Sequence, residues 1–269
     1  MTGTLVFIGL LCLALLAERM HPLAGRTPHD GQARVVANFG LGLLCRGAPY
    51  LFAYAGLSIL QVPADHGLLA VAALPPALEI AAGVLLLDLS VYAAHRLSHF
   101  LPWLWRLHHV HHSDARVDAT TVLRNHPLEL LITVTFTVAA TLIGGVGVEA
   151  LALYALLAES LGVLHHCEIR WPRRLERLLT LVIVTPHMHR LHHSAWQPET
   201  DSNYGALFSF WDRLFGTFRQ GVPDRYGLPE YDNPRHASLS AVLLSPFRAP
   251  ERLEAPAEHN ADARMHPSA

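Results

Sequence analysis

The stretch ALEIAAGVLLLDLSVYAAHRLSH, residues 77–99, decides the fold, because it joins a membrane-length apolar segment to a pair of histidines. Only two acidic side chains, Glu79 and Asp88, interrupt residues 77–94. A helix needs about 20 mainly apolar residues to cross the hydrocarbon core of a bilayer. These residues therefore predict a membrane-spanning helix. His95 and His99 continue it, and their spacing of four places both rings on one face near its end.

Four further apolar runs lie on either side of this stretch, at residues 5–17, 39–60, 128–143 and 148–164. The last two are separated by Gly144-Gly145-Val146-Gly147, which is typical of the turn of a helical hairpin. Over the whole chain 51% of residues are hydrophobic and 16% are charged, compared with roughly 25% charged in soluble domains. We predict an all-α integral membrane bundle of about four or five apolar helices.

Arginines are distributed unevenly among the connections between these runs. The segments after the first, third and fifth runs contain several, whereas residues 61–66 and the glycine turn contain none. Because basic connections stay on the cytoplasmic side, this multi-pass chain is predicted to place its histidine-rich ends in the cytoplasm. The chain has 20 basic residues, all of them arginine, a composition that favours a bacterial source and hence the bacterial inner membrane.

The same patterns divide the chain into an N-terminal transmembrane anchor region at residues 1–76, a catalytic domain at 77–220 and a C-terminal extension at 221–269. After Pro246 the extension becomes rich in alanine, proline and charge, which predicts partial disorder. A net charge of −2 without a basic run excludes a nucleic-acid-binding surface. Three widely spaced cysteines support neither a disulfide framework nor a thiolate metal site.

Histidine is unusually abundant, with 19 in the chain. One cluster has the spacing i, i+3 and i+4, which places three imidazoles on one helical face, and a second cluster repeats that spacing. Solvated surface histidines would not produce this repeat. Together with the pair at the end of residues 77–99, the clusters exceed what one tetrahedral or octahedral ion accepts, so they predict two metal ions. The eight candidate ligands are His95, His99, His108, His111, His112, His189, His192 and His193.

Two other histidine positions are ambiguous. His126 directly precedes a proline at the start of an apolar run, and His165-His166 ends another run. Glu159 lies seven residues before His166 and therefore on the same helical face, which favours His166 over His165 as the inward residue.

Acidic and amide side chains are candidates to hold the ligands from behind. Asp88 shares a helical stripe with Tyr92, His95 and His99, and we expect it to accept a hydrogen bond from a histidine's second nitrogen or to act through Tyr92. The other candidates for this supporting role are Glu129, Glu159, Asp201 and Asn203.

Imidazole ligands suit iron, zinc, copper and nickel alike, so ligand type leaves the metal open. Zinc would indicate a lipid hydrolase, and iron would indicate oxidation of an unactivated C–H bond. A protein that binds or transports divalent metal is a further alternative. Transport requires ionisable groups near the bilayer midplane, whereas these clusters lie at helix ends, where a site acts on lipids.

The sequence resembles the fatty acid hydroxylase/sterol desaturase superfamily of integral membrane di-iron oxygenases. The likeness covers roughly residues 85–218 and rests on the three histidine motifs, the Leu123–Glu129 element and the stretch ETDSNYGALFSFWDRLFGTF, residues 199–218. Three positions depart from the family pattern: His109 replaces a common arginine, Glu168 a usual asparagine and His187 a usual aspartate. None of these departures removes a ligand.

This resemblance implies two iron ions held by the eight motif histidines, with His126 and His166 as additions, and zinc as a substitute metal. It also implies O2-dependent hydroxylation or desaturation of a lipid or sterol taken from the bilayer. The sequence contains no flavin motif, haem-attachment motif or iron–sulfur cysteine set. A separate electron donor, a reductase, ferredoxin or cytochrome, is therefore expected.

Overall fold

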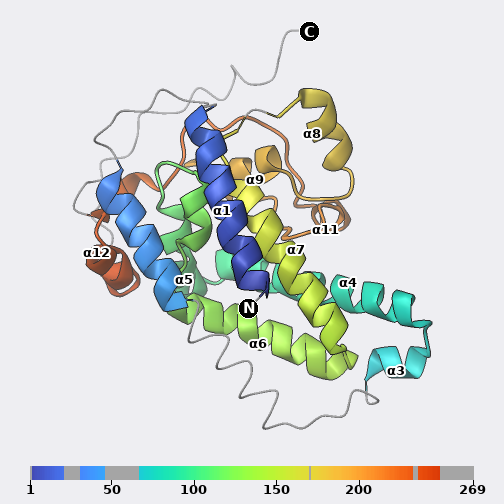
Figure 1. Ribbon diagram of the computed structural model, residues 1–269. Coiled ribbons are helices and arrows are strands. Elements are labelled where there is room, and N and C mark those ends of the chain that lie inside the picture. Colours follow the sequence, from blue (N-terminus) through green and yellow to red (C-terminus); the bar gives the residue numbers. More distant parts are fainter. Residues whose placement is uncertain (1, 21–30, 46–66, 170, 233–235, 249–269) are drawn as a thin grey trace.

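The computed structural model describes residues 2–20, 31–45, 67–169, 171–232 and 236–248. In these ranges the regular secondary structure is helical, apart from two isolated β-bridges, so the all-α prediction is confirmed (Figure 1). A helix over residues 32–45 follows the first helix. The remaining α-helices are α1 (Thr2–Met20), α3 (Leu68–Ala72), α4 (Pro76–Phe100), α5 (Pro102–His112), α6 (Pro127–Gly144), α7 (Val148–His166), α8 (Arg173–Leu179), α9 (Pro186–His192), α10 (Gln197–Thr200), α11 (Phe210–Leu214) and α12 (Leu239–Leu244).

Four of the described helices are long and apolar enough to cross a membrane, and they identify an integral membrane protein. They are α1, α4, α6 and α7, which correspond to four of the five apolar runs in the sequence. The fifth run, residues 39–60, begins within the helix over 32–45, but residues 46–60 lie outside the described part of the chain.

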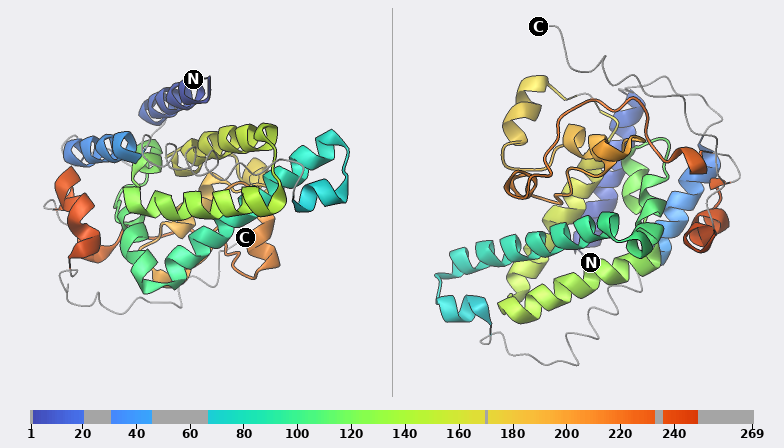
Figure 2. Two further views of the ribbon diagram at one scale, coloured as in Figure 1. Left: turned by 90° about the horizontal axis from the view of Figure 1, so that it is seen from below. Right: turned by 180° about the vertical axis from the view of Figure 1, so that it is seen from behind.

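The predicted hairpin is formed by α6 and α7. Helix α6 ends at Gly144, and Gly145 adopts a left-handed conformation with φ of 67°, which ends a helix without the steric cost of a side chain. Helix α4 packs against this hairpin through a buried apolar cluster that includes Val84, Leu87 and Tyr154. Helix α4 contacts both α6 and α7, and it runs alongside α6 in the right view of Figure 2.

Proline starts each of the helices α4, α5, α6 and α9. Its fixed φ favours the first helical turn, where the missing N–H costs no hydrogen bond. At Leu101 the chain is extended and leaves α4 for α5, so that the two helices meet at an angle. Consequently the histidines at the end of α4 and those along α5 approach one another.

The N-terminal and C-terminal segments cover this end of the bundle. Helix α1 packs on α7, and the fully buried Glu18 accepts hydrogen bonds from the backbone N–H groups of Ala119 and Glu168. Val242 of α12 is buried against Val110 of α5. The predicted disorder after Pro246 falls largely on residues 249–269, outside the described part, and the boundaries at 76/77 and 220/221 remain predictions.

Candidate metal centre

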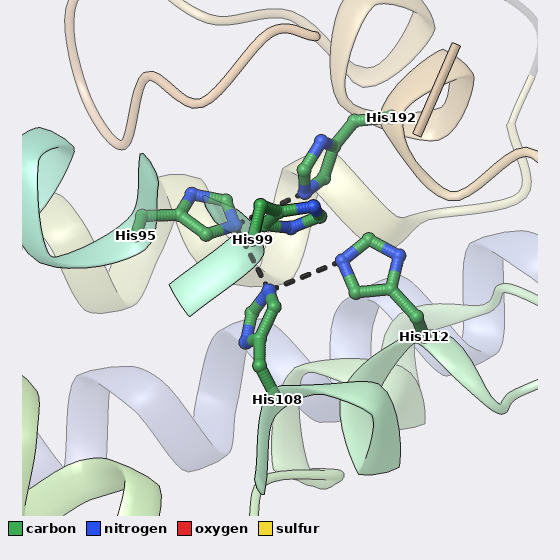
Figure 3. A group of neighbouring side chains, drawn as sticks. All are labelled: His95, His99, His108, His112 and His192. Atoms are coloured by element: carbon green, nitrogen blue, oxygen red, sulfur yellow. Dashed lines mark hydrogen bonds between the residues drawn. The ribbon is translucent and has the colours of Figure 1, made fainter. Parts of the chain in front are cut away.

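Nine histidines form two adjacent groups at the end of the membrane helices. Figure 3 shows the first group, in which rings from α4, α5 and α9 turn toward one another. Within each group the candidate ligand atoms all lie within 4.8 Å of one another. The first group contains His95, His99, His108, His112 and His192, and the second contains His111, His166, His189 and His193.

Each of the two repeated motifs contributes two histidines to one group and one histidine to the other, and the two motifs do so for opposite groups. From α5, His108 and His112 belong to the first group and His111 to the second. From α9 and its C-terminal end, His192 belongs to the first group, while the other two motif histidines belong to the second. The i, i+4 pair of each motif therefore serves one group, and the i+3 residue serves the other.

The nitrogen spacing in the first group fits a shared cation. The Nε2 atom of His108 lies 3.1 Å from that of His95 and 3.1 Å from that of His112, and the His95 and His192 Nε2 atoms are 3.0 Å apart. Two nitrogens bound to one ion at about 2.1 Å are about 3.0 Å apart when the bonds meet at about 90°. Lone pairs at this separation repel unless a proton or a cation lies between them.

The second group has the same spacing. The Nε2 atom of His166 lies 3.3 Å from that of His111 and 3.0 Å from that of His189, which is 3.2 Å from that of His193. The rings of His112 and His193 stack with centroids 4.6 Å apart, so the two groups are neighbours. The donor set thus fits two closely spaced ions.

A buried nitrogen without a hydrogen-bond partner supports this fit. Among the described residues, His99 Nε2 is buried and makes no hydrogen bond. Buried polar atoms are nearly always paired, and an unmodified imidazole would seldom leave a nitrogen in this state. For His99, whose Nδ1 faces Asp201, a cation beside Nε2 would satisfy the remaining nitrogen.

In six of the nine histidines, Nδ1 faces a hydrogen-bond acceptor. This contact fixes the tautomer that leaves Nε2 free to bind a metal. His108 Nδ1 donates to Glu129 Oε1 at 2.6 Å, and His99 Nδ1 lies 3.2 Å from Asp201 Oδ1. Four more Nδ1 atoms face backbone carbonyls: His95 with Tyr204 at 2.9 Å, His111 with Arg124 at 3.0 Å, His166 with Gly162 at 2.7 Å and His192 with Ser202 at 2.6 Å.

Burial keeps the histidines of α5 and α9 neutral. It lowers the pKa of His108 to about 3 and, together with neighbouring imidazoles, lowers the pKa values of His111, His189 and His192 well below the usual value. A neutral imidazole binds a metal ion without first releasing a proton. These side chains are therefore ready to act as ligands at neutral pH.

Three histidines of the sequence motifs lie outside both groups. His126 is the N-cap of α6: its Nδ1 accepts a hydrogen bond from the Leu128 N–H at 3.2 Å, and its Nε2 faces the Leu243 carbonyl. His165 faces the Val184 carbonyl at 3.0 Å, whereas its neighbour His166 belongs to the second group. His109 turns away and stacks on Tyr231 with centroids 4.5 Å apart.

Asp88 does not have the role expected from its helical stripe. Instead of a histidine, its carboxylate accepts hydrogen bonds from the Leu207 and Phe208 N–H groups and the Trp211 indole at 2.9, 3.1 and 2.9 Å. A helical stripe identifies a shared face but not the segment that crosses it. Asp88 thus anchors the loop that follows Tyr204, whose carbonyl faces His95.

Of the four remaining candidates for the supporting role, two contact histidines directly and two lie elsewhere in the fold. Glu129 and Asp201 contact histidines, as described above. Asn203 instead ties two backbone segments together, donating to the carbonyls of Met188 and Arg219 and accepting from the Arg219 N–H. Glu159 is half-buried on α7, about two turns before His166.

Replacing Asp88 with alanine should destabilise the protein by about 3 kcal/mol, because three buried donors lose their acceptor and each unsatisfied donor costs roughly 1–3 kcal/mol before relaxation. Thermal unfolding in detergent measures the loss, and protease cleavage near residues 205–211 should accelerate. Asp88→Asn retains one acceptor oxygen and should fall between wild type and Asp88→Ala. Equal stability of all three proteins would contradict the anchoring role.

Replacing Glu129 with alanine should weaken metal binding by about 10–100-fold, because His108 loses the acceptor that orients its ring. Glu129→Gln keeps an acceptor at the same position without the charge and should lose about tenfold or less. Competition with a chromophoric chelator measures the affinity. If glutamine and alanine weaken binding equally, the carboxylate charge, and not the orientation, is responsible.

Several contacts that build the site have no signal in the sequence. Four Nδ1 partners are backbone carbonyls, which have no side-chain signature. A buried polar network of Arg34, Asn38, Asp114 and Arg124 also supports the chain behind α5. Its aspartate lies two residues after the histidine motif in sequence, but its partner Arg34 is eighty residues away.

Fold and site together describe a membrane protein with two adjacent groups of buried histidines whose spacing fits metal ions. The sequence pattern of the fatty acid hydroxylase family matches residues 80–217, just over half of the chain. The chain therefore belongs to the fatty acid hydroxylase family.

Individual relatives are lipid-modifying enzymes. Ornithine lipid hydroxylase of Rhizobium tropici is 31% identical over 144 residues, which are 54% of this chain and 43% of that protein. A cholesterol 25-hydroxylase-like protein of Danio rerio is 32% identical, with coverages of 52% and 55%. Human alkylglycerol monooxygenase is 30% identical, with coverages of 49% and 28%. The chain thus spans about half or less of these relatives, and no solved structure matches it significantly.

Proposed function

We propose that this protein is a di-iron oxygenase that uses O2 and external electrons to hydroxylate or desaturate a C–H bond of a bilayer lipid or sterol. The observation that carries the proposal is the pair of adjacent histidine groups at the end of apolar helices of membrane length. The names of the relatives supply the lipid class and the oxidative reaction type.

When bound, two iron ions would supply the oxidising power for removing hydrogen from an unactivated C–H bond. The protein's own residues hold the ligands in position. His95, His99, His108, His112 and His192 would hold one ion, and His111, His166, His189 and His193 the other. Glu129 and the backbone carbonyls orient the rings, while burial of the histidines excludes bulk water from the centre.

Two details of the proposal rest on sequence patterns. The arginine distribution supports a cytoplasmic position for the histidine groups in a bacterial inner membrane. The lack of sequence motifs for a bound flavin, haem or iron–sulfur cluster supports delivery of electrons by a separate reductase, ferredoxin or cytochrome. A cytoplasmic site would be accessible to such a donor.

The proposal is tested by metal analysis and Mössbauer spectroscopy of detergent-purified protein from iron-supplied cells. About two coupled iron ions per chain are expected, followed by O2 consumption when an electron donor and bilayer lipids are added. Zinc without iron, or lipid cleavage that consumes no O2, would instead identify a hydrolase and overturn the proposal.

A further inference from the structure

A groove of about 400 Å³ runs along the outer face of α4, at the same level as the first histidine group. The groove residues that belong to α4 lie on one face of this helix, over its last three turns up to Phe100. Phe215, which follows α11, closes one side and stacks on Tyr92 with centroids 5.3 Å apart. The lining residues are Leu89, Tyr92, Ala93, Arg96, Leu97, Phe100 and Phe215.

The groove faces the region that lipids would occupy. It lies on a helix of membrane-spanning length, and Phe100 and Phe215 are 77% and 42% exposed. Large apolar side chains exposed in this way are stable next to acyl chains but costly next to water. An acyl chain therefore fits the apolar lining better than a water-soluble molecule does.

Arg96 is the one charged side chain among the described residues of the groove. It lies one turn before the end of α4, at the depth where a long cationic side chain reaches the lipid head groups. It is close enough to the hydroxyls of Tyr92 and Tyr204 to interact with both. This placement complements a lipid with an anionic head group, since arginine binds phosphate oxygens through two parallel donors.

Tyr204 connects the groove to the metal centre. Its ring lies edge-on to Tyr92, a groove residue, with centroids 6.3 Å apart. On its other side it contacts three members of the first histidine group, with centroid distances of 5.7 Å to His95, 5.0 Å to His99 and 5.7 Å to His192. The buried Tyr204 ring thus contacts both Tyr92 of the groove and the first histidine group.

We infer that this groove admits the substrate laterally from the bilayer, that the substrate is a lipid with an anionic head group held by Arg96, and that its chain reaches the first histidine group past Tyr204. The inference rests on the proposed function. It adds to that function a route, a head-group class and two positioning residues, Arg96 and Tyr204.

The test uses the full-length protein in vesicles of phosphatidylcholine containing phosphatidylglycerol with a diazirine-labelled acyl chain. Mass spectrometry maps the photo-crosslinks, which are expected on residues 89–100 and on Phe215. Ala93→Trp fills the groove and should reduce these crosslinks at least tenfold. Ala81→Trp places the same side chain on an exposed position of α4 away from the groove and should leave them unchanged.

The head-group preference is tested separately with Arg96→Gln. Crosslinking of labelled phosphatidylglycerol should fall several-fold, whereas crosslinking of labelled phosphatidylcholine, whose phosphate charge is balanced by choline, should fall less. Equal effects on both lipids would overturn the assignment of an anionic head group. If both Ala93→Trp and Arg96→Gln are folded and still give wild-type crosslinks with labelled phosphatidylglycerol, the groove is not a lipid site.

Crosslinking does not require turnover, so failure of this inference is distinguishable from failure of the proposed function. If the wild-type protein oxidises lipid and Ala93→Trp, with unchanged iron content, oxidises it equally fast, the route is wrong and the oxygenase proposal stands. If the wild-type protein holds no iron, the oxygenase proposal fails, and the crosslinks alone decide whether the groove binds lipid.

Discussion

Replacing His189 or His192 with alanine is expected to reduce the metal content from about two ions per chain to about one and to abolish lipid oxidation. Each substitution removes one nitrogen, but from different groups: His189 from the second and His192 from the first. Loss of a ligand leaves an incomplete coordination shell, which costs more than the 10–100-fold loss typical of a supporting residue. Metal analysis and turnover measurements on the purified variants provide the readout.

The matched control is His187→Ala. His187 lies on the same helix, α9, but it is exposed and belongs to neither histidine group. This variant should keep both ions and the wild-type rate. Loss of metal from His187→Ala to the same extent as from His189→Ala would mean that histidine content, and not the two groups, determines binding.

Replacing Asp114 with alanine should lower the free energy of unfolding by about 3 kcal/mol, the low end of the range for breaking a buried ion pair. The Asp114 carboxylate is buried and accepts hydrogen bonds from Arg34 at 2.9 Å, Asn38 at 3.2 Å and Thr121 at 2.8 Å. Because Asp118 still pairs with Arg34, the guanidinium keeps one partner. Chemical unfolding in detergent measures the change.

The control for this substitution is Asp232→Ala, which breaks the exposed pair with Arg225. Exposed ion pairs contribute about 0–1 kcal/mol, so this variant should unfold almost as the wild type does. If both substitutions destabilise the protein equally, burial of the Asp114 network does not determine its contribution.

The stability supplied by Asp114 should also depend on pH. Burial acts to raise the pKa of its carboxyl, but the nearby Arg34 and Arg124 guanidiniums outweigh burial and hold the pKa below its usual value. A carboxyl with a lowered pKa contributes fully above the pKa of the unfolded chain, about 3.9, and the contribution disappears as the pH falls through the folded value. The difference in stability between wild type and Asp114→Ala should therefore shrink below about pH 4.

The parts of the structure that could be predicted from the sequence are those with a local residue pattern. Apolar runs of membrane length predicted four of the described helices, and the glycine turn predicted the hairpin of α6 and α7. Histidine spacing on a helix also indicated which rings share a face. These features depend on residues close together in the chain, so they leave a periodic signal.

Features that depend on packing between distant segments could not be predicted from the sequence. His108, His111 and His112 were expected to act from one face, yet the structure divides them between two groups, because the position of α9 decides which nitrogens meet. Likewise, the proline that follows His126 indicated a helix start, and the ring caps that helix instead of joining a group. A local pattern carries no information about the distant segment that packs against it. It therefore could not show whether a histidine joins the first group, the second group or neither.

The exchange of roles between the two repeated motifs has a consequence for how the protein acquires its metal. Because α5 and α9 each supply ligands to both groups, an ion bound in either group fixes the two helices relative to one another. The ligands of the other group are then already in place, and the cost of ordering them has been met. Metal uptake is therefore expected to be cooperative, with half-loaded chains scarce at intermediate metal concentrations.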